Sequence, residues 1–284
     1  MNRWRFALSK RWAGYLALTV VFAIACSGLG LWQFERRAEA RAEIDRIESN
    51  YERPAAPVGD VLDTPGSYAE SQKWLPVLLE GTYLADEQLL VRNRPFAGRP
   101  GFEVLTPLLL SDGSVFIVDR GWLPTGSEQD APDDIPAVPT GPVSVTARLK
   151  SGEPLISGRS TIAGSGQIAT IHLPQIAELL DRPAYTGAYG LVITETPEPE
   201  TAPMPSVKPV LDEGPHLSYA LQWFVFAILA FVGLGWGLRQ EYRSVNADDP
   251  EEKERADERA RRRAARAPSD DESEDALLEA SERR

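Results

Sequence analysis

Two segments of the chain are long and apolar enough to cross a lipid bilayer, and they restrict the possible folds more than any other feature. Residues 13–34 and 216–238 contain no Asp, Glu, Lys or Arg. A membrane-spanning helix needs roughly 20 such residues at about 1.5 Å of rise per residue. A surface helix of a soluble protein keeps a polar face, and neither segment has one. We therefore predict two transmembrane helices, at residues 13–34 and 216–238.

The first apolar segment has two alternative interpretations. Four basic residues within residues 1–12 precede it, as in a cleaved signal sequence, but its apolar stretch is longer than a signal peptide usually has. Cys26 suggests a lipid-modified cysteine, but Ala23 stands where an export motif usually has Leu. We therefore expect Cys26 to face lipid or the neighbouring helix as a small apolar residue.

The charges that flank the two segments predict the orientation of the chain. Residues 1–12 hold no acidic residue, and Arg239 and Arg243 follow the second segment. Positive flanks stay in the cytoplasm, so both termini should be cytoplasmic and residues 35–215 extracytoplasmic. Arginines within residues 36–46 oppose this orientation, but long domains are translocated largely regardless of charge. The lack of an Arg- and Ser-rich amphipathic transit peptide favours a bacterial plasma membrane over a mitochondrion.

Between the two segments, the sequence predicts a charged helix, a β-rich domain and a linker. Residues 35–53 combine strong helix formers with mixed charges, and Pro54 ends the helix. Residues 54–195 predict an α+β domain, for which a barrel is one arrangement, and the Pro-rich residues 196–215 predict a stiff linker. The predicted strands are 74–83, 88–94, 102–110, 115–121, 143–149, 167–172 and 189–195, with a loop at 125–142 and a helix at 174–180.

The C-terminal segment, residues 239–284, is too polar to fold as an independent domain. Beyond Arg243 it is rich in Glu, Asp and Arg, and it lacks a sizeable apolar face. Such a segment cannot bury enough apolar surface to offset the entropy that it would lose on folding. We predict a disordered, charged cytoplasmic tail with a transient helix near residues 251–266.

Composition excludes several classes of function. The chain has a net charge of −12 and no basic stripe, which argues against nucleic-acid binding. Its single cysteine excludes an internal disulfide framework, a Cys₄ zinc site and a dithiol copper carrier. The usual enzyme signatures are absent, since the sequence has no P-loop, nucleophile elbow or zinc-protease motif.

Three weaker motifs have ordinary structural explanations. Residues 164–169 match a dinucleotide-binding pattern by letter, but they precede a predicted strand instead of opening a helix after one. Asp130, Asp133 and Asp134 lack the spacing of a calcium loop, which favours a solvated loop. His172 lies in an apolar run, and we interpret it as a core or edge histidine of a strand.

The outer ends of the two predicted spans carry the most informative side chains. An ionisable residue at the mouth of a span is a functional candidate by default, and His216 is such a residue. It could ligate the iron of haem, a flat apolar ligand whose propionates would meet arginines of the first span. The same residue types also form ordinary membrane-interface belts. The residues concerned are Trp32, Gln33, Arg36 and Arg37 in the first segment and His216, Tyr219 and Trp223 in the second, with Gly28, Gly30 and Ala220 leaving room for the macrocycle.

Five short motifs, in order along the chain, resemble the surfeit locus protein 1 family of cytochrome c oxidase assembly factors. They lie at the end of the first span, at three places in the central domain and at the start of the second span. The resemblance covers about residues 13–240. The motifs are LGLWQ at 29–33 with Arg36 after it, VRNR at 91–94, GFEVLTPL at 101–108, VDRGWLP at 118–124 and HLSYALQWF at 216–224.

This resemblance implies a non-enzymatic membrane factor that helps to build an aa₃-type haem–copper oxidase. Members of the family are thought to assist the delivery of haem a to the catalytic subunit, so the implied partners are oxidase subunit I and the haem a synthesis enzymes. The family's proposed haem-ligating histidine corresponds to His216, and Trp32 and Gln33 match its first-span motif. Arg120, Gly121 and Trp122 match its domain motif, in which Asp119 replaces an Asn that is common among relatives.

Three hypotheses follow, and the domain motif has a structural interpretation under each. Gly121 would need a positive φ or close packing, Trp122 would anchor the core, and Arg120 would pair with an acid such as Glu103. The protein is then a haem a carrier for oxidase assembly, a scaffold that stabilises an assembly intermediate without binding haem, or an unrelated two-span receptor that signals through its tail. A Gly233-x-x-x-Gly237 pattern predicts close helix packing in the second span.

Overall fold

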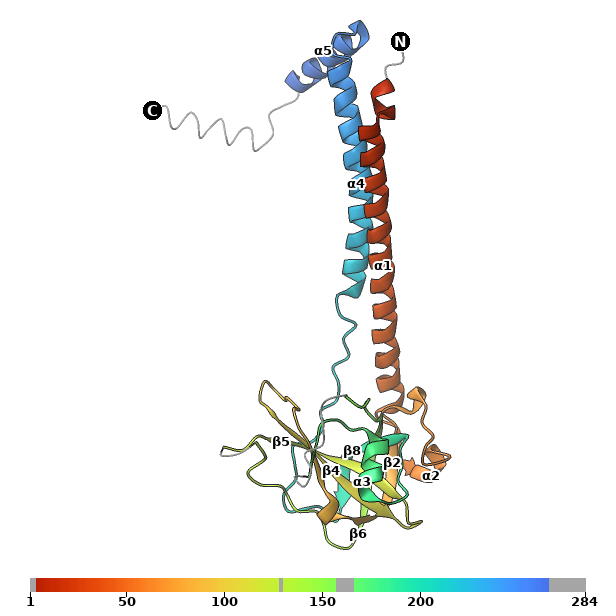
Figure 1. Ribbon diagram of the computed structural model, residues 1–284, viewed down its shortest axis with the longest axis vertical. Helices are drawn as coiled ribbons and strands as arrows, with labels where there is room; N and C mark the ends of the chain where they lie inside the picture. Colours follow the sequence, from red (N-terminus) through yellow and green to blue (C-terminus); the bar gives the residue numbers. More distant parts are fainter. Residues whose placement is uncertain (1–3, 128–129, 157–165, 266–284) are drawn as a thin grey trace, which may run out of the picture. The chain divides into compact units, whose positions relative to one another are not determined.

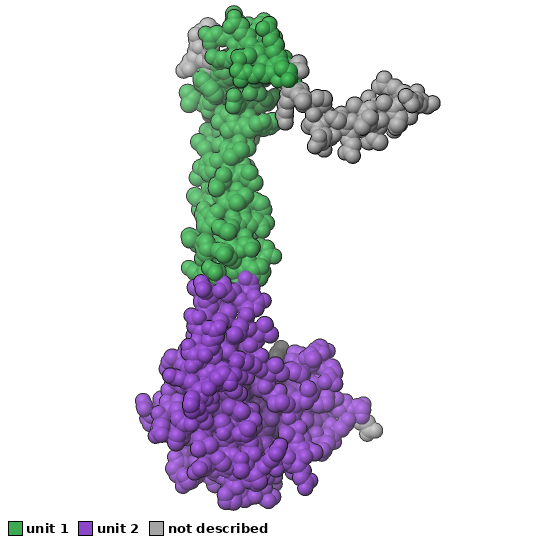
Figure 2. All heavy atoms as spheres, turned by 180° about the vertical axis from the view of Figure 1, so that it is seen from behind, with its two compact units in different colours: residues 1–37, 215–284 green, residues 38–214 purple. Residues whose placement is uncertain are grey.

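The computed structural model describes residues 4–127, 130–156 and 166–265, which form two compact units. One unit comprises residues 1–37 and 215–284 and the other residues 38–214, shown in green and purple in Figure 2. The first long helix, α1 (Lys10–Asn50), contributes residues to both units. We describe each unit separately.

The first unit is built from the two apolar helices. The apolar part of α1 lies antiparallel beside α4 (His216–Val245), and both contain windows with a mean hydropathy of 1.9 (Figure 1). Most of their large apolar side chains are exposed, among them Leu18, Ile24 and Trp236. A pair of apolar helices with outward-facing apolar side chains fits a membrane protein.

The two helices meet along one line of mostly small or half-buried residues, which we call the seam. The spacing alternates between four and three residues, the heptad pattern of coiled-coil packing. Close approach occurs at Gly30, where an added Cβ would lie 2.8 Å from the Phe224 ring. The seam residues are Thr19, Ala23, Cys26, Gly30, Gln33 and Arg37 on α1, and His216, Ala220, Trp223, Ala227, Ala230, Leu234, Gly237 and Glu241 on α4.

The seam resolves two of the sequence predictions. Cys26 is 1% exposed and lies in the seam, so it faces the neighbouring helix. The close packing predicted from Gly233-x-x-x-Gly237 is confirmed at Gly237, where an added Cβ would lie 3.4 Å from Trp12. It is wrong at Gly233, where nothing lies within 4 Å of an added Cβ. The glycine that permits the tightest contact is Gly30.

Two short helices complete the first unit. A 3₁₀ helix, η1 (Arg5–Leu8), precedes α1, and α5 (Pro250–Ala264) follows α4. Asp249 caps α5 by accepting a hydrogen bond from the Glu251 N–H, and Pro250 begins the helix. This helix lies where the sequence predicts a transient one, and residues 266–284 of the predicted disordered tail are outside the described residues.

The second unit contains a closed five-stranded barrel. The strands neighbour one another in the order β2 (Pro76–Tyr83), β6 (Pro142–Ser151), β8 (Ala188–Thr196), β5 (Val115–Pro124) and β4 (Gly101–Leu110), and pairing of β4 with β2 closes the ring. Of these pairings, only β5 with β8 is parallel. The predicted barrel-like α+β domain is therefore confirmed.

Strand periodicity explains the interior of the barrel. Val143, Val145, Ala147 and Leu149 alternate along β6, and all four are buried while the residues between them are partly exposed. This period of two places one face of the strand inside the barrel. In β5 both faces are covered: Phe116 joins the interior, while its neighbours join a second apolar cluster.

The second cluster forms beneath the elements that cover the outside of the barrel. Ile47 near the end of α1 and Ile176 of α3 (Leu173–Leu180) pack into it. Asn50 anchors the end of α1 by donating to the carbonyls of Ser71 and Lys73, both at 2.8 Å. The remaining short elements are β1 (Ala56–Pro57), α2 (Val58–Val61), η2 (Glu70–Gln72), η3 (Ala85–Glu87), β3 (Leu89–Val91) and β7 (Gln167–Ile168).

The last predicted strand segment before α3 is shorter than expected. We predicted a strand over residues 167–172, but β7 ends at Ile168, so the prediction that His172 lies on a strand is wrong. His172 instead caps α3, because its Nδ1 accepts a hydrogen bond from the Gln175 N–H at 3.3 Å. Pro174 lies in the first turn of the helix, where its missing N–H costs no intrahelical hydrogen bond.

The motif VDRGW forms a β-bulge in β5. Val104 of β4 is opposite Gly121 and Leu105 is opposite Asp119, which leaves Arg120 as the extra residue. Gly121 has a φ of +126°, the conformation predicted, and an added Cβ would lie 2.3 Å from the carbonyl oxygen of Met204. The Pro-rich linker is fixed at this point, because Met204 and Trp122 exchange two backbone hydrogen bonds.

Arg120 makes a buried ion pair, but not with the predicted partner. Its Nε lies 3.2 Å from Oε1 of Glu195 on β8, and its other nitrogens donate to the carbonyls of Pro136 and Ala137. Both charged side chains are almost fully buried. The prediction of Glu103 as the partner is wrong, because Glu103 lies on a neighbouring strand and pairs with Arg94 at 3.0 Å.

We predict that Arg120→Ala lowers the free energy of unfolding by about 3–5 kcal/mol, because it leaves the buried Glu195 carboxylate without its cation. Thermal unfolding of the full-length protein in detergent, followed by tryptophan fluorescence, measures this loss. The matched control is Arg182→Ala, which removes an exposed arginine 3.4 Å from Glu87 and should cost less than about 1 kcal/mol. Equal losses in the two variants would show that the buried pair has no special role.

Candidate functional site

The structure brings one predicted site pair into direct contact at the end of α4. The Nδ1 atom of His216 lies 2.9 Å from Oε1 of Gln33 on α1. His216 begins α4 and Gln33 occupies the facing position of the seam. If the Gln33 carbonyl accepts the Nδ1 proton, the neutral ring keeps its lone pair on Nε2, the tautomer that a metal-ligating histidine uses.

The other residues predicted for this site divide between two surfaces. Trp32 and Tyr219 are 52% and 49% exposed and point away from the seam, and Arg36 is also exposed. Arg37 and Trp223 are half-buried within the seam. Arg36 and Arg37 each interact with another group of the chain. The seven predicted residues therefore surround the helix ends instead of lining one closed cavity.

The space between the helices is filled. Ala220 is fully buried and the Phe224 ring occupies the position above Gly30. Ala220 and Gly30 therefore leave no room for the predicted macrocycle between the helices, whereas nothing lies within 4 Å of a Cβ added at Gly28, where room for it stays a prediction. The donor set nevertheless suits a haem held on the outer surface of the helix pair, with one imidazole nitrogen for iron and exposed aromatic faces beside it.

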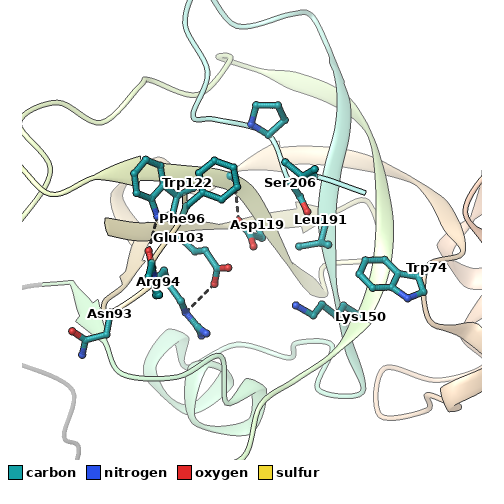
Figure 3. Close-up of a pocket in the computed structure, with 14 residues that line it drawn as sticks. Trp74, Asn93, Arg94, Phe96, Glu103, Asp119, Trp122, Lys150, Leu191 and Ser206 are labelled. Atoms are coloured by element: carbon teal, nitrogen blue, oxygen red, sulfur yellow. Dashed lines mark hydrogen bonds and ion pairs between the residues drawn. The ribbon is translucent and has the colours of Figure 1, made fainter. Parts of the chain in front are cut away.

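A second candidate site is a pocket of about 410 Å³ in the barrel unit (Figure 3). Asp119 and Trp122 of the β5 motif line it, together with Arg94, Glu103 and Lys150 from other strands and loops. Figure 3 shows the side chains of Arg94, Glu103 and Lys150 directed toward a common space. Residues 205–207 of the linker line another part of the pocket.

Charge in this pocket is closely balanced. Arg94 bridges two carboxylates, with Nε 3.0 Å from Glu103 and Nη2 2.5 Å from Glu153. The pKa of Asp119 is raised well above its ordinary value by burial, with repulsion from Glu103 adding to the effect. Burial also raises the pKa of Glu103, although Arg94 and Lys150 oppose it. Burial in this pocket therefore favours the neutral form of both carboxyl groups, and of Asp119 most strongly.

The bulge sends neighbouring motif residues to opposite sides of the sheet. Asp119 faces the pocket and its Oδ1 accepts the Gly121 N–H at 3.0 Å. Trp122 also lines the pocket, where its Nε1 donates to the Arg94 carbonyl at 2.6 Å. Arg120 is not among the residues that line the pocket, which separates its role in stability from any ligand contact.

The sequence analysis missed Lys150 and Glu153 and did not assign Arg94 to a site. These residues come from separate parts of the chain, and only the closed barrel brings them together. The sequence offered only an indirect indication of this site: Arg94 and Glu103 belong to two of the motifs that carry the family resemblance.

The weaker motifs do not form ligand sites in the described residues. Asp133 accepts a hydrogen bond from the Ser127 N–H at 3.0 Å, a loop contact. Within residues 4–127, 130–156 and 166–265, no three or more His, Cys, Asp or Glu side chains are grouped to hold a metal ion. Residues 164 and 165 of the pattern at 164–169 lie outside the described residues.

We predict that Asp119→Asn raises the stability of the protein at neutral pH. The pKa of Asp119 is higher in the folded protein than its unfolded value of about 3.9. The folded state therefore binds the proton more tightly, and the free energy of unfolding falls as pH rises through the interval between the two pKa values. The amide introduced by this substitution would stay neutral, and its carbonyl oxygen would still accept the Gly121 N–H.

Unfolding of the full-length wild type and variant at about pH 4 and pH 7 tests this prediction. The variant should be more stable than the wild type at pH 7, because the wild type must either keep Asp119 protonated or bury its charge at that pH. The difference should shrink toward pH 4. A difference that does not change with pH would show that ionisation of Asp119 is not its cause.

Comparison with known proteins places the chain in a family. A model of the SURF1 family matches residues 20–228. An uncharacterized SURF1-like protein of Mycobacterium tuberculosis (strain ATCC 25618 / H37Rv) is 33% identical over 247 residues, which cover 86% of this chain and 89% of the relative. A SURF1-like protein of Dictyostelium discoideum is 28% identical over 110 residues, covering 37% and 41% of the two chains. Because the family model matches most of the chain and the mycobacterial relative aligns over nearly its full length, the chain belongs to the SURF1 family.

Proposed function

We propose that this protein is a non-catalytic membrane factor that assists the assembly of an aa₃-type cytochrome c oxidase. In this proposal it holds haem a at the outer end of its helix pair and passes it to oxidase subunit I. The haem a synthesis enzymes would supply the cargo. Family membership supports the assembly role, and the two apolar helices support a place in the membrane.

The charges flanking the helices support the orientation that we propose. The four basic residues among the first twelve, together with Arg239 and Arg243, would keep both termini in the cytoplasm of a bacterial cell. The barrel unit would then lie outside the plasma membrane. His216, at the start of α4, would lie at the outer membrane surface.

The contact between Gln33 and His216 is the observation that carries the haem proposal. A histidine that ligates a metal almost always donates its second N–H to an acceptor, which fixes the ring and its tautomer. The Gln33 carbonyl at 2.9 Å from Nδ1 is such an acceptor. His216 would thus present Nε2 to haem iron, while the exposed rings of Trp32 and Tyr219 offer apolar contact beside it.

An open site is appropriate for a carrier. One histidine ligand on the surface of a packed helix pair would hold haem weakly, and a carrier must release its cargo. Because the seam is already filled, haem binding and release would not require the helices to separate. The proposed role of the protein residues is therefore to orient His216 and to shield one face of the haem.

A scaffold that binds no haem is the second candidate. The packing around Ala220 and Gly30 favours it, because Ala220 is fully buried and the Phe224 ring fills the space beside Gly30. In this alternative, the protein would stabilise an oxidase intermediate through its barrel unit, and the contact of His216 with Gln33 would only join the helix ends.

We predict that full-length protein purified from cells that make haem a carries haem a absorbance, and that His216→Ala abolishes it. Gln33→Leu should lower haem occupancy by about tenfold or more, since loss of a partner that orients a metal ligand typically weakens binding by 10–100-fold. His172→Ala is the matched control, because it removes the other histidine of the chain, which caps a helix in the barrel unit.

The haem a spectrum of the oxidase in membranes from the same strains separates the two candidates. The carrier proposal requires that His216→Ala lowers the haem a content of the oxidase while other oxidases remain intact. If wild type and variant are both colourless and the variant assembles a normal oxidase, the carrier proposal fails and the scaffold remains.

A further inference from the structure

A pocket of about 520 Å³ lies at the end of the helix pair opposite His216, within the first unit. Gly235 and Leu238 of α4 form its apolar part. Trp4 and Tyr242 add two aromatic rings that stack with centroids 4.4 Å apart. Tryptophan and tyrosine concentrate at the level of the lipid headgroups, so this pocket carries the side chains of a membrane interface.

Four arginines give the mouth of this pocket an excess of positive charge. Arg239 and Arg243 come from α4, and Arg255 and Arg259 from α5. The opposing charge lining the pocket is Glu252, which is only 6% exposed. Its carboxylate lies 2.7 Å from Arg259 and 3.8 Å from Arg255.

The charges in this pocket are therefore incompletely matched. Arg239 and Arg243 make no hydrogen bond or ion pair with a described residue, but the charge of Arg243 still acts on Glu252: Arg259, and after it Arg255 and Arg243, lower the pKa of this carboxyl. Arg255 also lies 3.6 Å from Glu251, so four guanidinium groups meet two carboxylates and keep a formal excess of two positive charges. Guanidinium groups bind phosphate through paired, charge-assisted hydrogen bonds, so an anion with phosphate oxygens matches this excess.

The apolar part of the pocket indicates which phosphate compound fits. Nothing lies within 4 Å of a Cβ added at Gly235, and the adjacent Trp236 is 69% exposed on the apolar surface of α4. A free inorganic phosphate would gain nothing from this surface. A phospholipid would place its phosphate among the arginines and its acyl chains along the apolar helix.

The sequence of α5 fixes this geometry and supplies a control. Positions 252, 255 and 259 follow the i, i+3, i+7 spacing of one helix face, which carries the arginines into the pocket. Arg261 and Arg262 do not line the pocket, and Arg262 bonds to Glu258 at 2.6 Å. The cap at Asp249 holds the first turn of α5, including Glu252, in the helical conformation.

We propose that Arg239, Arg243, Arg255 and Arg259 bind the phosphate headgroup of an anionic phospholipid in the cytoplasmic leaflet. The proposal rests on the membrane orientation given above but not on haem binding. It gives the charged C-terminal segment a function: α5 supplies half of a lipid site and lies at the membrane surface. Juxtamembrane arginines are attracted to anionic lipid headgroups, so a group of four suits such a site.

Full-length protein in detergent, titrated with short-chain phosphatidylglycerol or phosphatidylcholine and measured by native mass spectrometry, tests the proposal. Wild type should bind phosphatidylglycerol at least about tenfold more tightly than phosphatidylcholine. The double variant R255Q/R259Q should lose this preference. The matched double variant R261Q/R262Q removes the same charge from the same helix and should keep it.

Further measurements make each outcome decisive. Far-UV circular dichroism should show unchanged helicity for both double variants of α5. If the pocket is the site, the α4 double variant R239Q/R243Q should also lose the preference for phosphatidylglycerol. Displacement of bound lipid by millimolar inorganic phosphate would show a phosphate site and overturn the lipid assignment. Equal losses in the two α5 variants, or equal binding of the two lipids, would show nonspecific attraction and also overturn it.

The outcome is separable from that of the proposed function. His216 lies at the other end of α4, so the His216→Ala variant should bind phosphatidylglycerol as tightly as the wild type does. Loss of lipid preference in R255Q/R259Q with normal haem a absorbance would support the lipid site alone. A protein that carries no haem but still discriminates between the lipids would leave the lipid site intact and remove only the carrier proposal.

Discussion

The buried ion pair between Arg120 and Glu195 is the interaction on which the barrel most depends. It joins β5 to β8, whose parallel pairing extends over only two residue positions, Val118 with Gly190 and Asp119 with Leu191. So short a ladder contributes few backbone hydrogen bonds to close the barrel. A buried charge that has lost its partner is strongly destabilising. The two charges are neutralised only when β5 and β8 lie side by side, so the ion pair favours the correct pairing of these strands.

The same bulge also determines what the outer face of β5 presents. Arg120 is the extra residue of the bulge, and its side chain lies against Glu195, whereas Asp119 and Trp122 line the pocket. Gly121 permits this because it adopts a positive φ and lets the linker backbone approach at Met204. A single five-residue motif therefore stabilises the barrel, fixes the linker and supplies part of a charged pocket.

Most of the fold could be predicted from local patterns, whereas the site could be predicted only in part. Apolar length indicated α1 and α4, and alternation indicated β6 almost to its ends. The partner of Arg120 could not be predicted, because Glu195 becomes its neighbour only through the order of strands in the closed barrel. The sequence analysis placed His216, Tyr219 and Trp223 in one candidate site. In the structure, the seam has a period of 3.5 residues and includes His216 and Trp223, while Tyr219 faces outward.

The packed seam suggests why the chemistry of the helix pair is confined to its two ends. The middle of the seam is mostly alanine, glycine and cysteine, and its Thr19 hydroxyl donates to the Tyr15 carbonyl of the same helix at 2.8 Å. The backbone hydrogen bonds are satisfied within each helix. Polar side chains can face each other only where the helices leave the apolar layer, at Gln33 with His216 and at Trp12 with Glu241. In the two proposals made above, each polar end would bind a different molecule, and the packed seam between the ends would not have to open for either of them.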